Sequence, residues 1–480
     1  MNGVNTMKKS IALILLFSML LTVFSACSGE EVTLLNFLME GSSTLDLDDE
    51  VVTICSEEGT DDVLETLFEH PVNTSTYDAI LRRLSMLEDK YNCSFDIVSR
   101  GYREKMTANL MTLASTGDST IDIIFAGSVG ILSGLALGGI ILPLTDVKDY
   151  IDYENSEKFG SAGLLEVAMV KGVPHAVQPV QWPGFTNNYA FYIIYNRDQF
   201  NRYAMTDLHE YYENENWTFD TFENLFKTYE TVPSEEVDLF YLQKGFFTYS
   251  AMLANGVKLC DYDGYEFYND FDSTKTYNAI EWAFNICDRY EDILIIEDYP
   301  YCNEEFNEEK VIMALTNTML ITQDINYKAN FEFGIMPFPC GPDAVYGEWA
   351  CFTETIRGFG ISAFSDIPEA SAMIINDLFD PFEEISTENG LAEYYRDQVF
   401  LTDLDTEIFL KTGKNIRSLY GSHSPALINF TADLKNSTQS VAQLIQKHEG
   451  PIEALIMEHI RPNYENYLYE HLEAEDLQID

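Results

Sequence analysis

Short apolar segments alternate with amphipathic helical segments over residues 50–137, and this alternation constrains the fold more than any other feature of the sequence. The apolar segments are rich in β-branched residues, which favours strands. Between them, residues 78–92 and 104–115 carry apolar side chains at helical spacing, and a further helical stretch runs to Leu137. Strands that alternate with helices indicate a parallel sheet with helices on both faces, so we predict an α/β fold. The predicted strands are Glu50–Cys55, Cys93–Val98 and Ile121–Ala126.

A similar alternation returns in the second part of the chain. The 480 residues are too many for one ordinary domain, and this length suggests about two or three domains. From Pro368 onward the sequence is largely helical, and Gly450–Pro451 is predicted to interrupt the helical pattern of Ser440–Ile460. We expect strands at Tyr189–Tyr195 and Phe333–Pro339, and helices near Gln199, after Trp217 and over Ser273–Tyr290.

The N-terminus has the pattern of an export signal. Two lysines precede an apolar run, Ile11–Phe24, that is shorter than the roughly 20 residues a membrane-spanning helix needs. The run ends in Phe24-Ser25-Ala26-Cys27, which resembles the lipobox of bacterial lipoproteins, although phenylalanine stands where leucine is usual. We therefore expect a lipoprotein signal peptide at residues 1–26, lipidation of Cys27 and a flexible polar tether at 27–49. An ordinary signal peptide with an incidental Cys27 is the alternative.

The net charge limits the partners of this chain. The formal net charge is −51, from 28 basic and 79 acidic residues. Such a surface repels phosphate backbones, so we expect no nucleic-acid partner, and a neutral or cationic ligand suits it better than a polyanion. The 29 tyrosines and 31 phenylalanines supply flat faces that can stack on sugar rings, although most of them are expected in the core.

The sequence gives little support for an enzyme or a metal protein. The cysteines form no C-x-x-C pair and are expected to be small buried hydrophobic residues, and we expect neither a metal nor a cofactor. A secreted glycosidase needs only two carboxylates, and 79 acidic residues make any such pair uninformative. No G-x-S-x-G or H-E-x-x-H motif is present, so we expect a protein without catalytic activity.

Several segments, taken together and in order, resemble the extracellular solute-binding proteins, family 1, of ATP-driven import systems, which are relatives of maltose-binding protein. The resemblance extends over about Val51–Ile460, and each motif is weak alone. Asp122–Phe125 resembles the strand before the family's ligand loop, and Gly172–Val177 resembles the motif G-K-hydrophobic-Y-G-hydrophobic-P without its tyrosine. Tyr192–Phe200 is similar to L-Y-Y-N-K-D-L-F, and Trp217–Phe222 resembles T-W-D-E-F. Phe306–Met313 is similar to F-x-x-G-K-A-A-M with Glu309 in place of glycine, and Phe333–Pro339 resembles Y-G-hydrophobic-x-P-hydrophobic-P.

The resemblance implies a periplasmic-binding-protein-like fold, with two α/β lobes, a hinge and a ligand cleft between the lobes. We expect residues 50–150 and about 305–345 in the N-terminal lobe, and about 185–300 and 355–480 in the C-terminal lobe. The implied function is capture of a small solute, with a neutral sugar or oligosaccharide favoured, at the outer face of the cytoplasmic membrane. Delivery to the transmembrane subunits of an ABC permease and a monomeric state are also implied. A surface-displayed glycan binder and a sensor-associated receptor remain alternatives.

Candidate ligand residues follow from the places where strands end or the chain crosses between lobes. Glu57 follows the first predicted strand, and Gly127 and Ser128 follow the third. For each polar candidate a structural or solvated role is equally open, and for the two tryptophans burial in the core is the alternative. The remaining candidates are Trp182, Asn187 and Tyr189 before the second lobe, and Trp349 and Arg357 at the return crossing.

Overall fold

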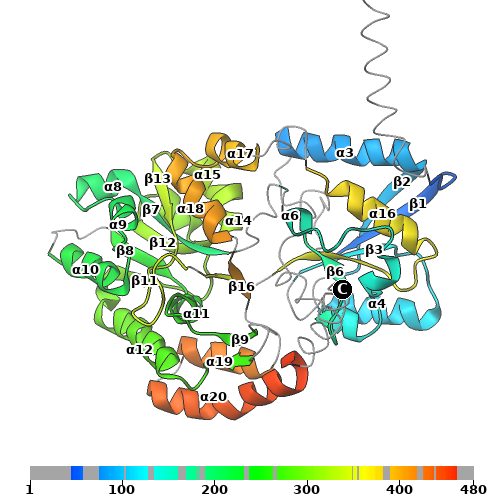
Figure 1. Ribbon diagram of the computed structural model, residues 1–480. Helices are drawn as coiled ribbons and strands as arrows, with labels where there is room; N and C mark the ends of the chain where they lie inside the picture. The colour runs from blue at the N-terminus through cyan, green and yellow to red at the C-terminus, as the bar shows by residue number, and fades with distance from the viewer. Residues whose placement is uncertain are drawn as a thin grey trace, which may run out of the picture.

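The computed structural model describes residues 45–57, 75–101, 104–127, 134–159, 169–180, 182, 190–231, 237–262, 267–348, 350–353, 356–381, 390–413, 415–418, 425–436 and 439–461. Figure 1 shows the elements of these segments arranged as two lobes side by side. Each lobe contains a five-stranded sheet with helices packed on it. The predicted α/β fold with two lobes is therefore confirmed.

The N-terminal lobe is built on a sheet with the strand order β2-β1-β3-β15-β6. The first three of these strands are parallel, and β15 runs antiparallel to both of its neighbours. The strands are β1 (Glu50–Ser56), β2 (Cys93–Ser99), β3 (Ile123–Ala126), β6 (Ala176–Val177) and β15 (Gly358–Ile361), with a hairpin of β4 (Met169–Val170) and β5 (Val173–Pro174) beside them. The helices are α3 (Ser75–Tyr91), α4 (Glu104–Thr116), the 3-10 helix η1 (Leu144–Val147), α6 (Ser156–Phe159) and α16 (Pro368–Leu378).

Helices cover both faces of this sheet, as the apolar strands require. Val52 and Ile54 lie in a core with α3 and α16, whereas Cys55 and Ile124 point to the other face and pack with α4. Successive side chains of a strand alternate between faces, so a strand covered on both sides must be apolar at nearly every position. That requirement explains the short β-branched runs in the sequence.

The C-terminal lobe is built on a second sheet with the strand order β11-β8-β12-β7-β13. Its strands are β7 (Phe191–Asn196), β8 (Asp238–Leu242), β11 (Leu294–Ile296), β12 (Val311–Asn317) and β13 (Phe333–Met336), and two small ribbons pair β9 (Leu259–Tyr262) with β10 (Phe267–Asn269) and β14 (Cys351–Thr353) with β16 (Ile416–Ser418). The helices are α8 (Arg197–Arg202), α9 (Leu208–Glu213), α10 (Phe219–Tyr229), α11 (Lys244–Ala254), α12 (Thr274–Arg289), η3 (Glu291–Ile293), α13 (Asn303–Asn307), α14 (Thr318–Leu320), η4 (Ile321–Ile325), α15 (Asn326–Lys328), α17 (Gly390–Gln398), α18 (Asp403–Gly413), α19 (Pro425–Asn436), α20 (Val441–Leu455) and η6 (Ile456–Ile460).

Aromatic side chains fill both faces of the second sheet. Phe222 of α10 packs edge-on against Phe240 of β8, with ring centroids 5.4 Å apart. On the other face Tyr192 of β7 stacks on Phe409 of α18 at 5.6 Å and donates a hydrogen bond to its carbonyl. Most of the aromatic residues that the structure describes are buried and therefore serve the core, as expected.

The predicted lobe boundaries need two corrections. Residues 305–345 were expected in the N-terminal lobe, but β12 pairs with β7 and β8, and β13 pairs with β7, in the C-terminal sheet. Conversely, residues 358–378 carry β15 and α16, which belong to the N-terminal lobe. The physical reason is that strand pairing is decided by partners distant in the sequence, which the pattern within one segment does not reveal.

Smaller corrections concern the predicted tether and a predicted helix break. Residues 45–49 fall in the expected flexible tether, yet Leu47 is buried and its N–H donates to the carbonyl of Tyr91. Pro451 does not end the C-terminal helix, because α20 continues through it to Leu455. The predicted signal peptide and Cys27 lie outside the described residues. Six described cysteines have free thiols and five of them are buried, which confirms their expected role. Among the described residues, no helix is long and apolar enough to cross a membrane.

A buried carboxylate ties α18 to the second sheet. Asp405 is fully buried and accepts a hydrogen bond from the backbone N–H of Ile335 at 2.9 Å. Arg197 lies 3.2 Å away and His209 3.0 Å away. Burial alone would raise the pKa of Asp405, but the hydrogen bond from His209 and the charges of His209 and Arg197 hold this pKa below its usual value.

We expect Asp405→Asn to lower the free energy of unfolding by about 3–5 kcal/mol at pH 7, because it removes the buried carboxylate that contacts His209 and leaves Arg197 with Asp207 as its ion-pair partner. A lowered native pKa gives stability that is complete above the unfolded value of about 3.9 and is lost as the pH falls through the native pKa. The variant should therefore lose less further stability than the wild type below about pH 4. Urea unfolding across this pH range tests both expectations. Asp397→Asn, at an exposed ion pair, is the control and should cost less than about 1 kcal/mol.

Candidate functional site

The carboxyl edges of the two sheets face the same crossing of the chain. Thr353 ends β14 and is bridged to Ala190, which directly precedes β7 at the carboxyl end of β12. Gly358 begins β15 and pairs with Ala126, the last residue of β3. The five steps from residue 353 to residue 358 can span at most about 18 Å, so the two edges lie close together. Ligands of open α/β sheets bind beyond such carboxyl ends, which makes the facing edges the candidate site.

Three predicted site residues meet at the edge of the N-terminal lobe. The N–H of Gly127 donates a hydrogen bond to Oε2 of Glu57, whose carboxylate is buried. A side chain at Gly127 would place its Cβ 3.0 Å from that oxygen and 3.1 Å from Cγ of Arg357. The absence of a side chain at Gly127 therefore lets Glu57 and Arg357 approach the same point.

Trp182 does not contribute a stacking face. It is 0% exposed, and its ring edge packs against Phe379 with centroids 5.0 Å apart. Its indole N–H donates to the carbonyl of Asp380 at 3.1 Å. The expectation that Trp182 contacts a ligand is therefore wrong in this arrangement, and its core alternative holds.

Asp380 is the centre of an anchor between two crossings of the chain. Trp182 lies on the first crossing, and Asp380 lies where α16 leads into the last one. The carboxylate of Asp380 pairs with Lys158 at 2.5 Å, and Arg83 of α3 donates to the carbonyl of Asp380 at 2.9 Å. These contacts hold the two crossings together at the N-terminal lobe.

The other predicted site residues cannot be placed. Ser128, Asn187, Tyr189 and Trp349 lie outside the described residues.

Two exposed tyrosines at the edge of the C-terminal lobe are a site feature that the sequence analysis missed. Tyr299 and Tyr301 follow β11 and are 66% and 52% exposed, although both are large aromatic residues. Their rings stack with centroids 5.8 Å apart and planes only 8° from parallel. The sequence signal was Tyr-Pro-Tyr, which follows the apolar segment Leu294–Ile296 after two acidic residues.

The backbone of this tyrosine pair is held in place by neighbouring strands. Tyr241 of β8 donates from its hydroxyl to the carbonyls of Tyr299 and Tyr301, at 3.1 and 3.2 Å. Thr316 of β12 donates to the carbonyl of Pro300 at 3.2 Å. The pair is thus positioned above the carboxyl ends of β8 and β12, and it presents a preformed aromatic surface there.

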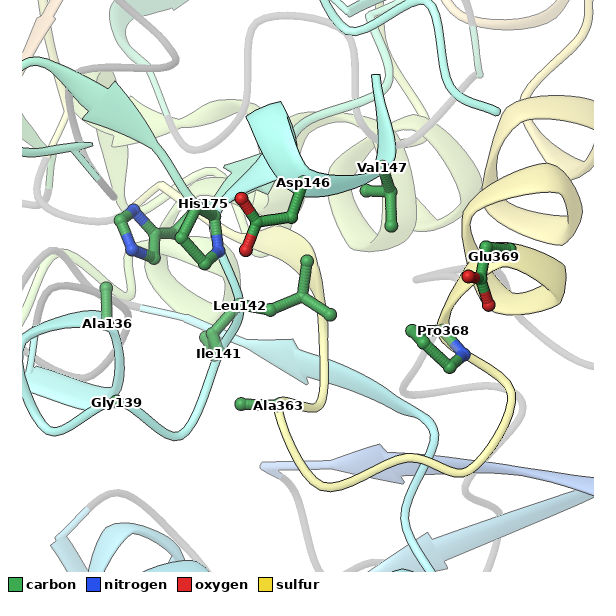
Figure 2. A pocket seen from close by; sticks show the side chains of 11 residues that line it. Ala136, Gly139, Ile141, Leu142, Asp146, Val147, His175, Ala363, Pro368 and Glu369 are labelled. Carbon is green, nitrogen blue, oxygen red and sulfur yellow. The ribbon is translucent and has the colours of Figure 1, made fainter. Parts of the chain in front are cut away.

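A pocket of about 440 Å³ lies elsewhere on the N-terminal lobe. Figure 2 shows Asp146 on η1, Glu369 near the start of α16, and His175 among the residues that line it. Ala363, after β15, and His175, before β6, place this pocket at the amino edge of β3, opposite Gly127. It is therefore separate from the candidate site. In the part of the chain that the structure describes, no cluster of His, Cys, Asp and Glu could hold a metal ion.

Comparison with known proteins identifies solved structures that have a similar fold. No protein-family model matches the sequence, and no curated protein matches it. An ABC substrate-binding protein from Listeria monocytogenes in complex with cycloalternan is similar, with a TM-score of 0.57 and 15% identity over 85% of this chain and 99% of that chain. The GacH receptor of Streptomyces glaucescens, whose structure is known with acarbose, is similar with a TM-score of 0.60 and 13% sequence identity. The match covers 86% of this chain and 99% of that chain. UgpB from Mycobacterium tuberculosis in complex with glycerophosphocholine is similar with a TM-score of 0.57 and 14% sequence identity. The match covers 85% of this chain and 98% of that chain.

This chain has the fold of ABC substrate-binding proteins. The similarity covers nearly the whole of each of these structures and about 85% of this chain, so it extends over both lobes. At 13–15% identity the likeness concerns the fold alone.

We expect Trp182→Ala to lower the free energy of unfolding by about 3–5 kcal/mol, because it removes a buried indole from the core. Trp182→Phe should cost only about 1 kcal/mol, since it loses the N–H bond but keeps a ring against Phe379. Denaturant unfolding of both variants measures this. An alanine variant as stable as the wild type that no longer bound its ligand would reinstate Trp182 as a ligand residue.

Proposed function

We propose that this chain is the substrate-binding component of an ABC-type import system and captures a neutral sugar or oligosaccharide between its lobes. The stacked, exposed pair Tyr299 and Tyr301 at the carboxyl edge is the observation that carries the proposal. Flat aromatic faces suit the apolar faces of sugar rings, and large exposed aromatic groups in a fixed geometry are typical of binding surfaces. Similar proteins with cycloalternan and acarbose support the same ligand class.

The polar edge of the N-terminal lobe suits the hydroxyl groups of such a ligand. Glu57 offers a carboxylate and Arg357 a guanidinium, close to the same glycine. A pair of opposite charges can accept and donate hydrogen bonds without requiring a charged ligand. The net charge of −51 also disfavours an anionic solute.

We further propose that the protein is anchored by a lipid at Cys27, on the outer face of the cytoplasmic membrane. The apolar run and small residues before Cys27 support this. From there a monomer would deliver its solute to the permease subunits. The proposed scheme contains no catalytic step, so the solute would be released unchanged.

A thermal-shift screen of the chain from Ser28 onward tests the function. A solute that binds only the folded protein raises the melting temperature by mass action. Maltotetraose, acarbose, cycloalternan, glycerophosphocholine, free amino acids and peptides make up the panel. A large shift with an oligosaccharide that is recovered intact is expected. A shift only with a peptide or choline compound would overturn the sugar class, and hydrolysis of the glycan would overturn the binding-protein assignment.

We expect the double substitution Tyr299→Ala and Tyr301→Ala to weaken oligosaccharide affinity by about 10- to 100-fold, because both stacking faces are lost. Both rings are exposed, so the melting temperature of the free protein should change little. Calorimetric titration and thermal unfolding measure the two effects. Tyr150→Ala removes another exposed tyrosine, near η1, and should leave affinity unchanged. Equal affinity in the double variant would contradict the proposed platform.

We expect Gly127→Ala to weaken binding at least tenfold, because the new Cβ would push apart Glu57 and Arg357. Gly450→Ala, where a Cβ meets nothing within 4 Å, is the matched control and should bind as the wild type does. The same titration compares them. Unchanged binding in Gly127→Ala would remove this trio from the site.

A further inference from the structure

Gln178 is a buried side chain whose polar atoms are both unpaired. It is 2% exposed. Within the described part of the chain, neither its Oε1 nor its Nε2 has a hydrogen-bond partner. Of the buried side chains with an unpaired polar atom, Gln178 alone among the described residues has two.

The register of the sheet places Gln178 at the candidate site. Val177 pairs with Phe359, so one step further along β6 puts Gln178 beside Gly358. Gly358 pairs with Ala126. Ser56 pairs with Phe125, which puts Glu57 beside Ala126 in the same way. Glu57, Ala126, Gly358 and Gln178 therefore form one row across the carboxyl edge.

Small residues separate the two polar ends of this row. Side chains in one row across a sheet project to the same face. The two middle positions carry only a methyl group and no side chain, at Ala126 and Gly358. With strands about 4.8 Å apart, the three intervals separate the backbones of Glu57 and Gln178 by about 14 Å. A glutamine amide and a carboxylate thus stand at the two ends of a row whose middle residues are small.

An unpaired buried amide destabilises the free protein, and such groups are rare in native structures. An unpaired buried amide at a binding edge is explained if a bound ligand supplies its hydrogen-bond partners. Gln178 also stands where the chain leaves the N-terminal lobe for β7.

We propose that Gln178 is a specificity-determining residue that hydrogen-bonds neighbouring hydroxyl groups of the sugar. This inference rests on the proposed function and adds to it. An amide both donates and accepts, so it is fully paired only by groups that do the same. Hydroxyl groups do so, whereas an ammonium group only donates and a carboxylate only accepts. Gln178 therefore selects a hydroxyl-rich, uncharged edge of the ligand.

The test compares Gln178→Met with Gln199→Met in the chain from Ser28 onward. Methionine keeps the length of the side chain and removes its polar atoms. Gln199 is also fully buried, but its Nε2 donates to the carbonyl of Glu309 at 2.8 Å. The probes are maltotetraose, cellotetraose and xylotetraose, and the measurements are the melting temperature without sugar and the affinity by calorimetric titration.

We expect Gln178→Met to melt at or above the wild-type temperature, because an unpaired group is removed, and to bind its sugar at least tenfold more weakly. Gln199→Met should melt lower and bind normally. If Gln178→Met melts lower, as the control does, Gln178 is structural and the inference fails. Unchanged sugar affinity would also overturn it while leaving the proposed function standing. A wild-type protein that binds no neutral oligosaccharide would overturn both.

Discussion

The arrangement of both lobes depends on the pairing of β15 with β3. This contact draws residues 358–361 back into a sheet whose other long strands come from the first part of the chain. Because β15 lies in the N-terminal lobe and β14 lies against the C-terminal lobe, the chain must cross between them at residues 353–358. The same pairing sets Gly358 beside Ala126, and so brings Arg357 next to Gly127. One antiparallel contact thus joins the lobes and completes the polar half of the site.

The crossings are held by different interactions at their two ends. At the N-terminal lobe, the anchor around Asp380 combines a buried indole, an ion pair and an arginine that donates to carbonyls at the end of α16. At the C-terminal lobe, Phe352 of β14 stacks against Phe191 with centroids 5.5 Å apart, and both rings are buried. Each lobe therefore keeps its own end of a crossing rigid.

Local patterns predicted the elements well and their partners poorly. The strands at 50–56, 93–99 and 333–336 were recognised because apolar β-branched residues mark a buried strand wherever it pairs. The partner of Phe333–Met336 was assigned to the wrong lobe, because nothing within that segment distinguishes the two sheets. Gly358–Ile361 was not recognised as a strand at all, since two of its four residues are glycines and resemble a turn.

The site was predictable to the extent that it depends on strand ends. Glu57 and Gly127 were chosen because parallel strands bring their carboxyl ends to one edge, and Arg357 was chosen because it stands at the return crossing. Ligand contact at these three residues stays a prediction. Gln178 was missed because β6 has only two residues, too few to show a strand pattern. Tyr299 and Tyr301 were missed because exposure decides whether a tyrosine belongs to the core or to a surface. Trp182 shows the reverse error, since a tryptophan in a crossing segment is as useful for packing as for binding.

The two halves of the candidate site differ in kind, and under the proposed function this difference would make ligand capture selective. The N-terminal edge presents hydrogen-bonding groups on strand ends, and the C-terminal edge presents stacked rings. A ligand can shift the lobes toward closure only by as much as it favours the closed arrangement over the open one. A purely apolar solute contacts the rings and leaves Glu57 and Arg357 without new partners. A small ion contacts the polar edge and leaves the rings uncovered. Only a molecule with a flat apolar face and a hydroxyl-bearing rim contacts both edges at once, and a sugar ring has that shape.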